Sequence, residues 1–79
     1  MGVEVTKTTE WVINAEADED SLKVEMQDDT IFAVKSRLTT SSYTAGSETS
    51  VTVVQFALEH PQEFQELLDM IKEIRRTYR

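Results

Sequence analysis

Residues 60–79 read HPQEFQELLDMIKEIRRTYR and contain the clearest structural signal in the chain. Pro61 suits the first position of a helix, where its missing amide proton would have no intrahelical acceptor. Hydrophobic residues then recur at helical spacing and form one apolar stripe, which predicts a helix over about residues 61–77. The stripe is a candidate for packing on a sheet or across a dimer axis. Its members are Phe64, Leu67, Leu68, Ile71, Ile74 and Tyr78.

The other side chains of this segment favour the same helix. Glu63 lies in its first turn, and Arg75 and Arg76 lie near its end. This order matches the helix dipole, which favours negative charge at the N-terminus and positive charge at the C-terminus. Met70 and Tyr78 widen the stripe and would suit a second contact across a dimer axis.

The sequence before this helix has the composition of β-strands. Stretches rich in β-branched and aromatic residues, with alternating hydrophobicity, predict strands at about residues 3–15, 21–27, 31–41 and 49–58. The first stretch is long enough to need a bend or bulge near Thr8 and Thr9. The order of elements predicts a single α+β domain over residues 1–79. An antiparallel sheet of about four strands, a meander with a long hairpin, would be packed by one C-terminal amphipathic helix.

The numbering of hydrophobic residues predicts the register of the second and third strands. A three-residue loop at 28–30 would pair Met26 with Phe32 and Val24 with Val34. The two Asp residues in that loop tolerate the left-handed conformation that such loops need. All four paired residues would then lie on the inner face of the sheet. The first strand adds odd-numbered residues to this face, namely Val3, Val5, Trp11 and Ile13.

The same argument extends the inner face to a fourth strand. A second loop near residues 45–47 would pair Leu38 with Val54 and Val34 with Leu58. Residues 39–52, TTSSYTAGSETSVT, would then continue the hairpin beyond the core. This stretch contains nine Ser and Thr residues, so it can bury very little. It is either a disordered loop or an ordered hairpin arm that contacts a partner or a second subunit.

The size and composition of the chain indicate how it is stabilised. A chain of 79 residues buries only about 60% of the surface that its unfolded form exposes, so further stabilisation is expected. Cys is absent and His60 is the only histidine, which excludes disulfides and any thiolate or multi-imidazole metal site. Self-association, most simply as a homodimer, is the remaining source. The chain has no membrane-length apolar run and no signal-like start, so we expect an intracellular, cytoplasmic protein without membrane contact.

Acidic residues outnumber basic ones by 15 to 8, which gives a net charge of −7. They are densest between residues 10 and 29. Such a surface is either a solvated face or a docking site for a basic protein partner, for example by imitating nucleic-acid phosphates. The candidate partner-binding residues are Glu16, Asp18, Glu19, Asp20, Asp28 and Asp29.

One resemblance to a known family rests on the segment FALEHPQEFQELLDMI, residues 56–71. Four strands followed by a helix that starts at a proline resemble the positive cofactor four family of single-stranded-DNA-binding transcriptional coactivators. Leu58, Pro61, Phe64 and Leu67 fit that family's pattern of a strand end, a helix start, an aromatic residue and a leucine. The resemblance covers roughly residues 30–74. It implies a homodimer that binds unpaired nucleic-acid strands by backbone contacts and base stacking.

The candidate nucleic-acid-binding residues under this alternative are Lys35, Arg37, Trp11 and Tyr43. Binding of unpaired strands requires a basic groove with aromatic residues on an open face. The net charge of −7 disfavours such binding, because a field of that sign repels polyanions at long range.

No residue pattern predicts an enzyme, a cofactor or a metal site. The acidic residues lie mainly in turns, where water would surround them rather than the dry pocket that acid–base catalysis requires. Asp18, Asp20 and Glu25 lack the glycine of a calcium-binding loop. His60, at a helix start, is predicted to be a cap or a surface residue. The sequence therefore predicts a small acidic, non-catalytic binding or regulatory protein, and single-stranded nucleic-acid binding is the alternative.

Overall fold

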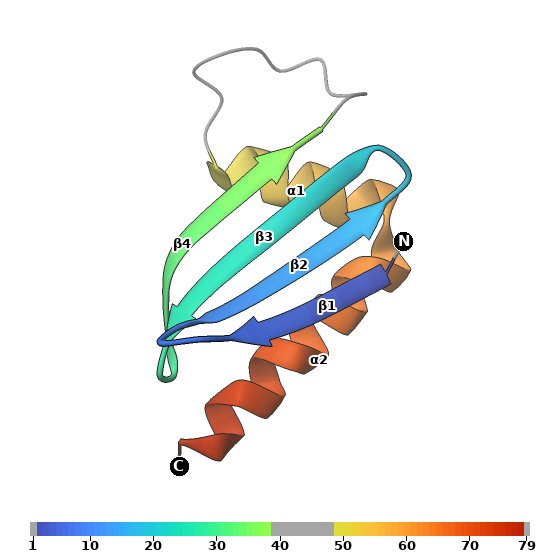
Figure 1. The fold of residues 1–79 in the computed structure, drawn as a ribbon. Coiled ribbons are helices and arrows are strands. Elements are labelled where there is room, and N and C mark those ends of the chain that lie inside the picture. The colour runs from blue at the N-terminus through green and yellow to red at the C-terminus, as the bar shows by residue number, and fades with distance from the viewer. Residues whose placement is uncertain (1, 39–48, 79) are drawn as a thin grey trace.

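The computed structural model describes residues 2–38 and 49–78 of the chain. They form a four-stranded antiparallel meander in the order β1-β2-β3-β4, followed by two helices that pack on one face of the sheet (Figure 1). The predicted α+β class is thus confirmed, with one more helix than expected. The elements are β1 (Gly2–Lys7), β2 (Trp11–Ala17), β3 (Asp20–Gln27), β4 (Thr30–Arg37), α1 (Thr49–Glu59) and α2 (Pro61–Thr77).

The long first strand of the prediction is in fact two strands. The chain reverses where a bend was expected, between Lys7 and Trp11, so β1 pairs with β2. Val3 pairs with Ala15 and Val5 pairs with Ile13. Because odd residues pair with odd residues, the odd-numbered hydrophobic residues still share the inner face, as predicted.

The turn between β3 and β4 is one residue shorter than expected. Gln27 pairs with Thr30 across a two-residue turn, in which Asp28 takes the left-handed conformation with φ 55°. Met26 therefore pairs with Ile31, and the predicted pairing with Phe32 is wrong. A β-bulge then shifts the register by one residue. The predicted pairing of Val24 with Val34 is correct, because a two-residue turn followed by a bulge gives the register of a three-residue loop.

The predicted strand at 49–58 is wrong, because this segment is α1. Phe56 on α1 is fully buried, whereas Val54 and Leu58 are exposed and pair with neither Leu38 nor Val34. Alternating spacing at 54, 56 and 58 favoured a strand, but a short apolar run also fits a helix. Residues 39–48, the centre of the predicted loop or hairpin arm, lie outside the described residues. The expected partner strand for such an arm is absent from the described part of the chain.

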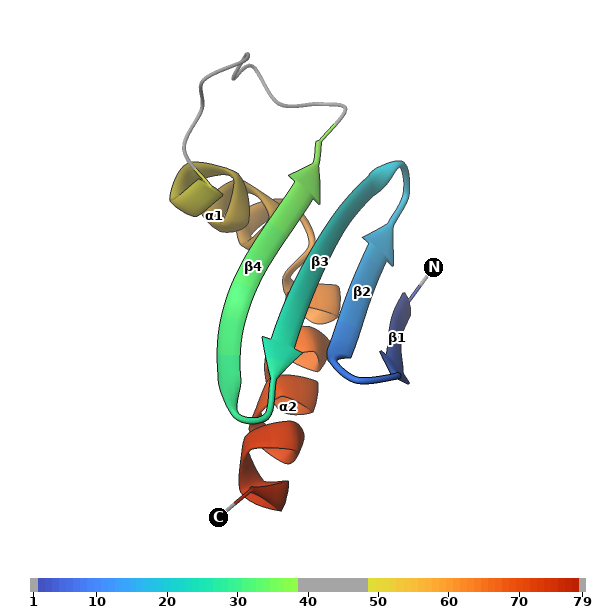
Figure 2. The same cartoon turned by 60° about the vertical axis from the view of Figure 1, so that its left-hand side comes forward.

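The width of the sheet explains the second helix. Four strands spaced about 4.8 Å apart span roughly 14 Å between the axes of the edge strands, whereas a helix with its side chains is about 10 Å wide. One helix therefore cannot cover the whole inner face. α2 packs on β1 and β2, and α1 packs on β3 and β4. Figure 2 shows both helices on the same side of the sheet.

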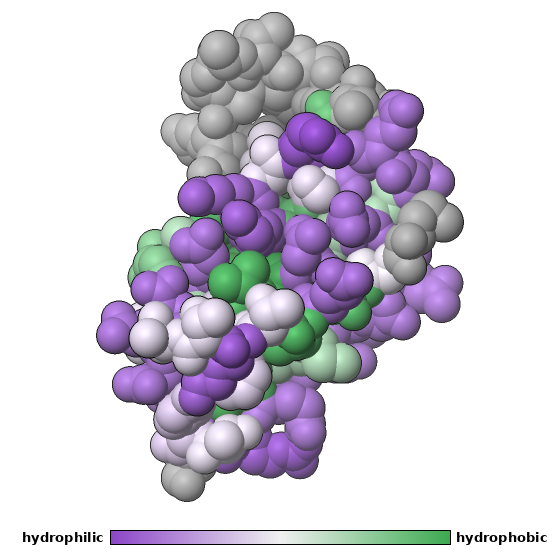
Figure 3. Space-filling view, in the orientation of Figure 1, coloured by the Kyte–Doolittle hydropathy of each residue, from purple (hydrophilic) through white to green (hydrophobic). Residues whose placement is uncertain are grey.

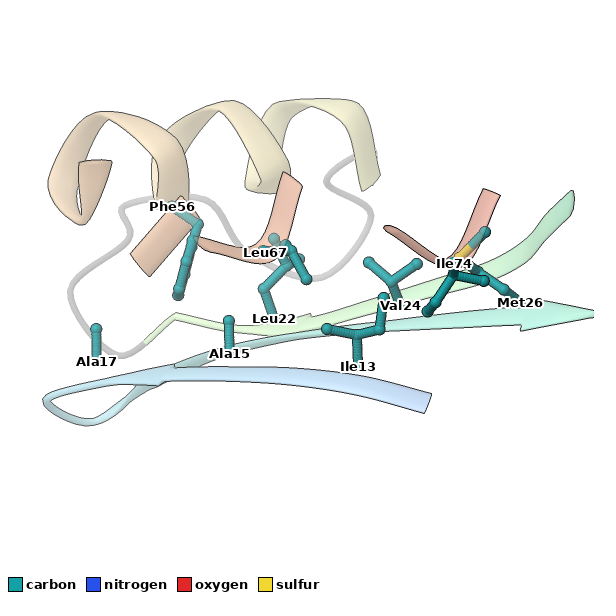
Figure 4. Close-up of a cluster of buried hydrophobic side chains, with 9 residues drawn as sticks. All are labelled: Ile13, Ala15, Ala17, Leu22, Val24, Met26, Phe56, Leu67 and Ile74. Atoms are coloured by element: carbon teal, nitrogen blue, oxygen red, sulfur yellow. The ribbon is translucent and has the colours of Figure 1, made fainter. Parts of the chain in front are cut away.

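The core lies between the inner face of the sheet and the two helices. Alternate residues of β2 and β3 point toward the helices, and one residue of α1 and two of α2 meet them (Figure 4). The buried hydrophobic residues are Ile13, Ala15, Ala17, Leu22, Val24, Met26, Phe56, Leu67 and Ile74.

A polar contact holds the C-terminal end of α2 to the sheet. The indole Nε1 of Trp11 donates a hydrogen bond to the hydroxyl of Tyr78 over 2.9 Å. The Lys7 ammonium lies 4.9 Å from the centre of the Trp11 ring. The end of α2 is therefore fixed beside the turn that joins β1 to β2.

We expect Leu67→Ala to lower the free energy of unfolding by about 2–5 kcal/mol, because it deletes buried methyl groups and leaves a cavity. Met70→Ala on the same helix is the matched control. Met70 is 38% exposed, against 1% for Leu67, so its truncation should cost much less. Urea denaturation followed by circular dichroism measures both values. Equal losses in the two variants would contradict the described packing of α2.

Candidate functional site

His60 is the one residue between α1 and α2, and its backbone is fixed by both helices. Its amide donates to the Phe56 carbonyl over 2.8 Å, which completes α1. Its carbonyl accepts from the Phe64 amide over 3.0 Å, which begins α2. Pro61 disfavours the helical conformation at the residue before it, and His60 has φ −133° and ψ 65°. The sharp change of direction between the helices therefore occurs at His60.

The imidazole of His60 meets the carboxylate of Asp20 at the edge of the core. Asp20 is the first residue of β3 and follows a turn in which Asp18 has φ 56°. The His60 Nε2 and the Asp20 Oδ2 are 2.8 Å apart. The side chains are only 11% and 4% exposed, respectively. The His60 ring also packs against Phe56, with ring centroids 5.1 Å apart.

Glu59 brings a second carboxylate to the same place. One ligand atom each from Asp20, Glu59 and His60 lies within 4.8 Å of the others. Glu59 is exposed, so the group opens to solvent on that side. Three polar side chains thus converge where the turn between β2 and β3 meets the helix junction.

The predictions about these residues are only partly correct. His60 occupies the N-cap position of α2, as expected, but its side chain makes no cap hydrogen bond and is mostly buried, so it is not a surface residue. Asp20 is buried and faces His60, so it is not part of an exposed acidic surface. The two residues are 40 positions apart, and no local pattern connects them. The only available signal was the isolation of a single histidine beside the proline that starts a helix.

The remaining acidic candidates do not form one surface. Glu16, Asp18 and Glu19 lie at or beside the turn that precedes β3, whereas Asp28 and Asp29 form the turn that follows it. The eight residues of β3 separate the two groups by roughly 25 Å, at about 3.3 Å per residue. Each group alone therefore remains a candidate contact for a basic partner, but the two cannot act as one surface.

The candidate nucleic-acid residues are also separated. Trp11 is packed on the helix side, where its indole contacts Tyr78. Lys35 and Arg37 alternate with the inner residue Val34 and lie on the opposite face. That face is mostly hydrophilic, with hydrophobic residues gathered near its middle (Figure 3). Tyr43 lies outside the described residues.

Glu25 counteracts the positive charge on the same outer face. Its carboxylate lies 3.8 Å from the Lys23 ammonium and 3.6 Å from the Lys35 ammonium. Lys35 pairs directly with Lys23 across the strands, so Glu25 offsets their repulsion. This arrangement leaves no continuous basic groove along the described part of β3 and β4.

The apolar stripe of α2 is used within the chain. Leu67 and Ile74 are buried, and Phe64 and Ile71 pack against the core. Leu68 is half-buried, and Tyr78 is exposed but bonded to Trp11. The predicted role of this stripe in packing on the sheet is correct. A dimer contact would therefore need another surface.

Such a surface lies on α1. Val54 and Leu58, one helical turn apart, are 56% and 74% exposed on the side of α1 opposite Phe56. Further exposed hydrophobic side chains lie at the start of β4, where Ile31 pairs with Met26 and Phe32 is the extra residue of the bulge. Both places present apolar area to solvent, and the α1 face contains the more exposed pair.

Comparison with known proteins gave no matching family model, no matching curated protein and no matching solved structure. The junction on which the coactivator resemblance was based also differs, because Leu58 lies in α1 and not at a strand end. Among the described residues, no helix is long and apolar enough to cross a membrane.

We expect Asp20→Ala to lower the free energy of unfolding by about 1.5–3 kcal/mol, because it leaves the buried His60 Nε2 without its carboxylate. Glu19→Ala, in the exposed turn beside it, is the control and should cost much less. Thermal and urea denaturation measure the difference. Equal stability of the two variants would show that the contact between Asp20 and His60 does not hold the helix junction.

Proposed function

We propose that this chain is a small non-catalytic binding protein that acts through protein contacts and forms a homodimer through the outer face of α1. One observation carries the proposal: α1 is hydrophobic on two sides, but the chain itself covers only one of them. Phe56 is buried on the inner side, whereas Val54 and Leu58 face solvent. A helix that is apolar all round is normally buried all round.

The charge of α1 supports a second copy as the occupant. Glu59 is the only charged residue of TSVTVVQFALE, in a chain in which 29% of the residues are charged. Two copies can therefore bring these helices together without placing like charges in contact, although each carries a net charge of −7. A small chain without cysteine also gains stability from burying this face, because its own core is limited.

A basic protein partner would dock elsewhere. Glu16, Asp18 and Glu19 lie at or beside the turn that precedes β3, whereas Val54 and Leu58 lie on α1. We propose this acidic turn as the regulatory contact of the dimer, because complementary charge accelerates association and selects the partner. No comparable observation favours nucleic-acid binding, since Trp11 and Lys35 lie on opposite faces of the sheet.

We expect the double variant Val54→Gln and Leu58→Gln to be monomeric where the wild-type chain is dimeric. Glutamine keeps the net charge and the helix propensity but removes the apolar contact. Met70→Gln, an exposed hydrophobic residue on α2, is the matched control and should stay dimeric. Sedimentation velocity at micromolar concentrations measures the mass of each. A monomeric wild-type chain, or a double variant that remains dimeric, would refute the proposed interface.

Salt separates the two kinds of contact. We expect the homodimer to tighten between low ionic strength and about 0.5 M salt, because screening weakens the repulsion between two acidic chains. Binding of a polylysine peptide to the acidic turn should instead weaken over the same range. Sedimentation and fluorescence anisotropy measure the two equilibria. A homodimer that dissociates as salt rises would indicate charge pairing rather than apolar contact.

A further inference from the structure

The convergence of Asp20, Glu59 and His60 has a use beyond holding the fold. We propose that these three side chains bind one divalent transition-metal ion of the zinc class. The site would join the start of β3 to the end of α1 and the helix junction, and His60 lies 40 positions after Asp20 in the sequence. It is independent of the proposed dimer, because all three ligands come from one chain.

The donor atoms fit this class of metal. One imidazole nitrogen and two carboxylate oxygens form a mixed nitrogen and oxygen set, which suits zinc and its neighbours in the first transition series. Calcium and magnesium prefer oxygen ligands alone, so the imidazole disfavours them. Two carboxylates also supply the negative charge that offsets a divalent cation.

The distances are close to those of a metal site. Bonds of about 2.0–2.2 Å place the ligand atoms of a tetrahedral zinc ion roughly 3.3–3.5 Å apart. The three donor atoms here lie within 4.8 Å of one another, and the closest pair, His60 Nε2 and Asp20 Oδ2, is 2.8 Å apart. Binding would widen the buried pair by about half an ångström. A small rearrangement of the Glu59 side chain, which is exposed, would close the remaining gap.

Two of the ligands are held in place before any metal binds. Asp20 is buried directly after the turn, and His60 is fixed by the backbone hydrogen bonds of both helices and by the Phe56 ring. The cost of ordering side chains on binding would therefore fall mainly on Glu59. Exposure of Glu59 gives the ion a route from solvent and leaves a fourth position for water.

We expect untagged protein to bind one Zn²⁺ per chain in isothermal titration calorimetry. Glu59→Gln should weaken this binding at least about tenfold, because removing even a group that only supports a metal ligand has an effect of that size. Glu66→Gln, an equal charge change at an exposed position of α2, is the matched control and should bind like wild type. Glu59→Gln leaves the buried pair intact, so both variants should fold. Circular dichroism checks this.

Two further readouts test the location of the ion. The chain contains a single histidine, so the ¹⁵N resonances of an imidazole report on His60 alone and should shift on zinc addition. Zinc at 100 times its dissociation constant should also raise Tm by roughly 10–20 °C, because only the folded chain brings the three ligands together.

Absence of saturable binding, unchanged affinity in Glu59→Gln, or an unshifted imidazole resonance would each overturn the proposed metal site. The variant with glutamine at positions 54 and 58 should bind zinc as the wild-type chain does. This comparison separates the metal site from the dimer, since failure of one proposal leaves the result for the other unaffected.

Discussion

A single residue, His60, joins the two helices, and Pro61 disfavours a helical conformation at that residue. The helices therefore diverge at a fixed point, and each covers a different half of the inner face of the sheet. The His60 imidazole lies at the edge of the core, where a buried polar group needs a hydrogen-bond partner. Asp20 supplies it at 2.8 Å, which ties the helix junction to the start of β3. The placement of both helices depends on this contact together with the apolar packing beneath them.

The two helices contribute differently to the molecule. α2 has one apolar side, and that side is used on β1 and β2, with Trp11 and Tyr78 fixing its far end. α1 is short, nearly uncharged and apolar on two sides, and only the side of Phe56 meets the sheet. α2 has the stronger amphipathic pattern, but the proposed protein contact lies on α1, because Val54 and Leu58 of α1 are exposed. The stripe of α2 has no large apolar surface left for a partner.

The polar features of the chain are divided among separate places. Acidic turns lie at the two ends of β3, and the cations of the outer face are balanced by Glu25. The cluster of Asp20, Glu59 and His60 lies beside the first of these turns, where the start of β3 meets the helix junction. A mixed set of a buried carboxylate, a mostly buried imidazole and an exposed carboxylate is suited to a cation and not to a polyanion. Charge and burial together therefore favour protein and metal contacts over nucleic acid.

The sequence by itself determined α2 and the class of fold, because α2 follows from helical periodicity and from a proline at the first helical position. It also determined the inner residues of the first three strands and the pairing of Val24 with Val34, because these follow from the alternation of hydrophobic residues. Tertiary structure decided the rest. Residues 49–58 became a helix because the sheet is wider than one helix, a constraint that no local window contains. Asp20 and His60 meet across 40 positions, and Trp11 and Lys35 separate to opposite faces, because such contacts depend on how elements pack. The spacing of hydrophobic residues determines on which face of its helix or strand a side chain lies. Only the packing of the elements decides which other residues that face contacts.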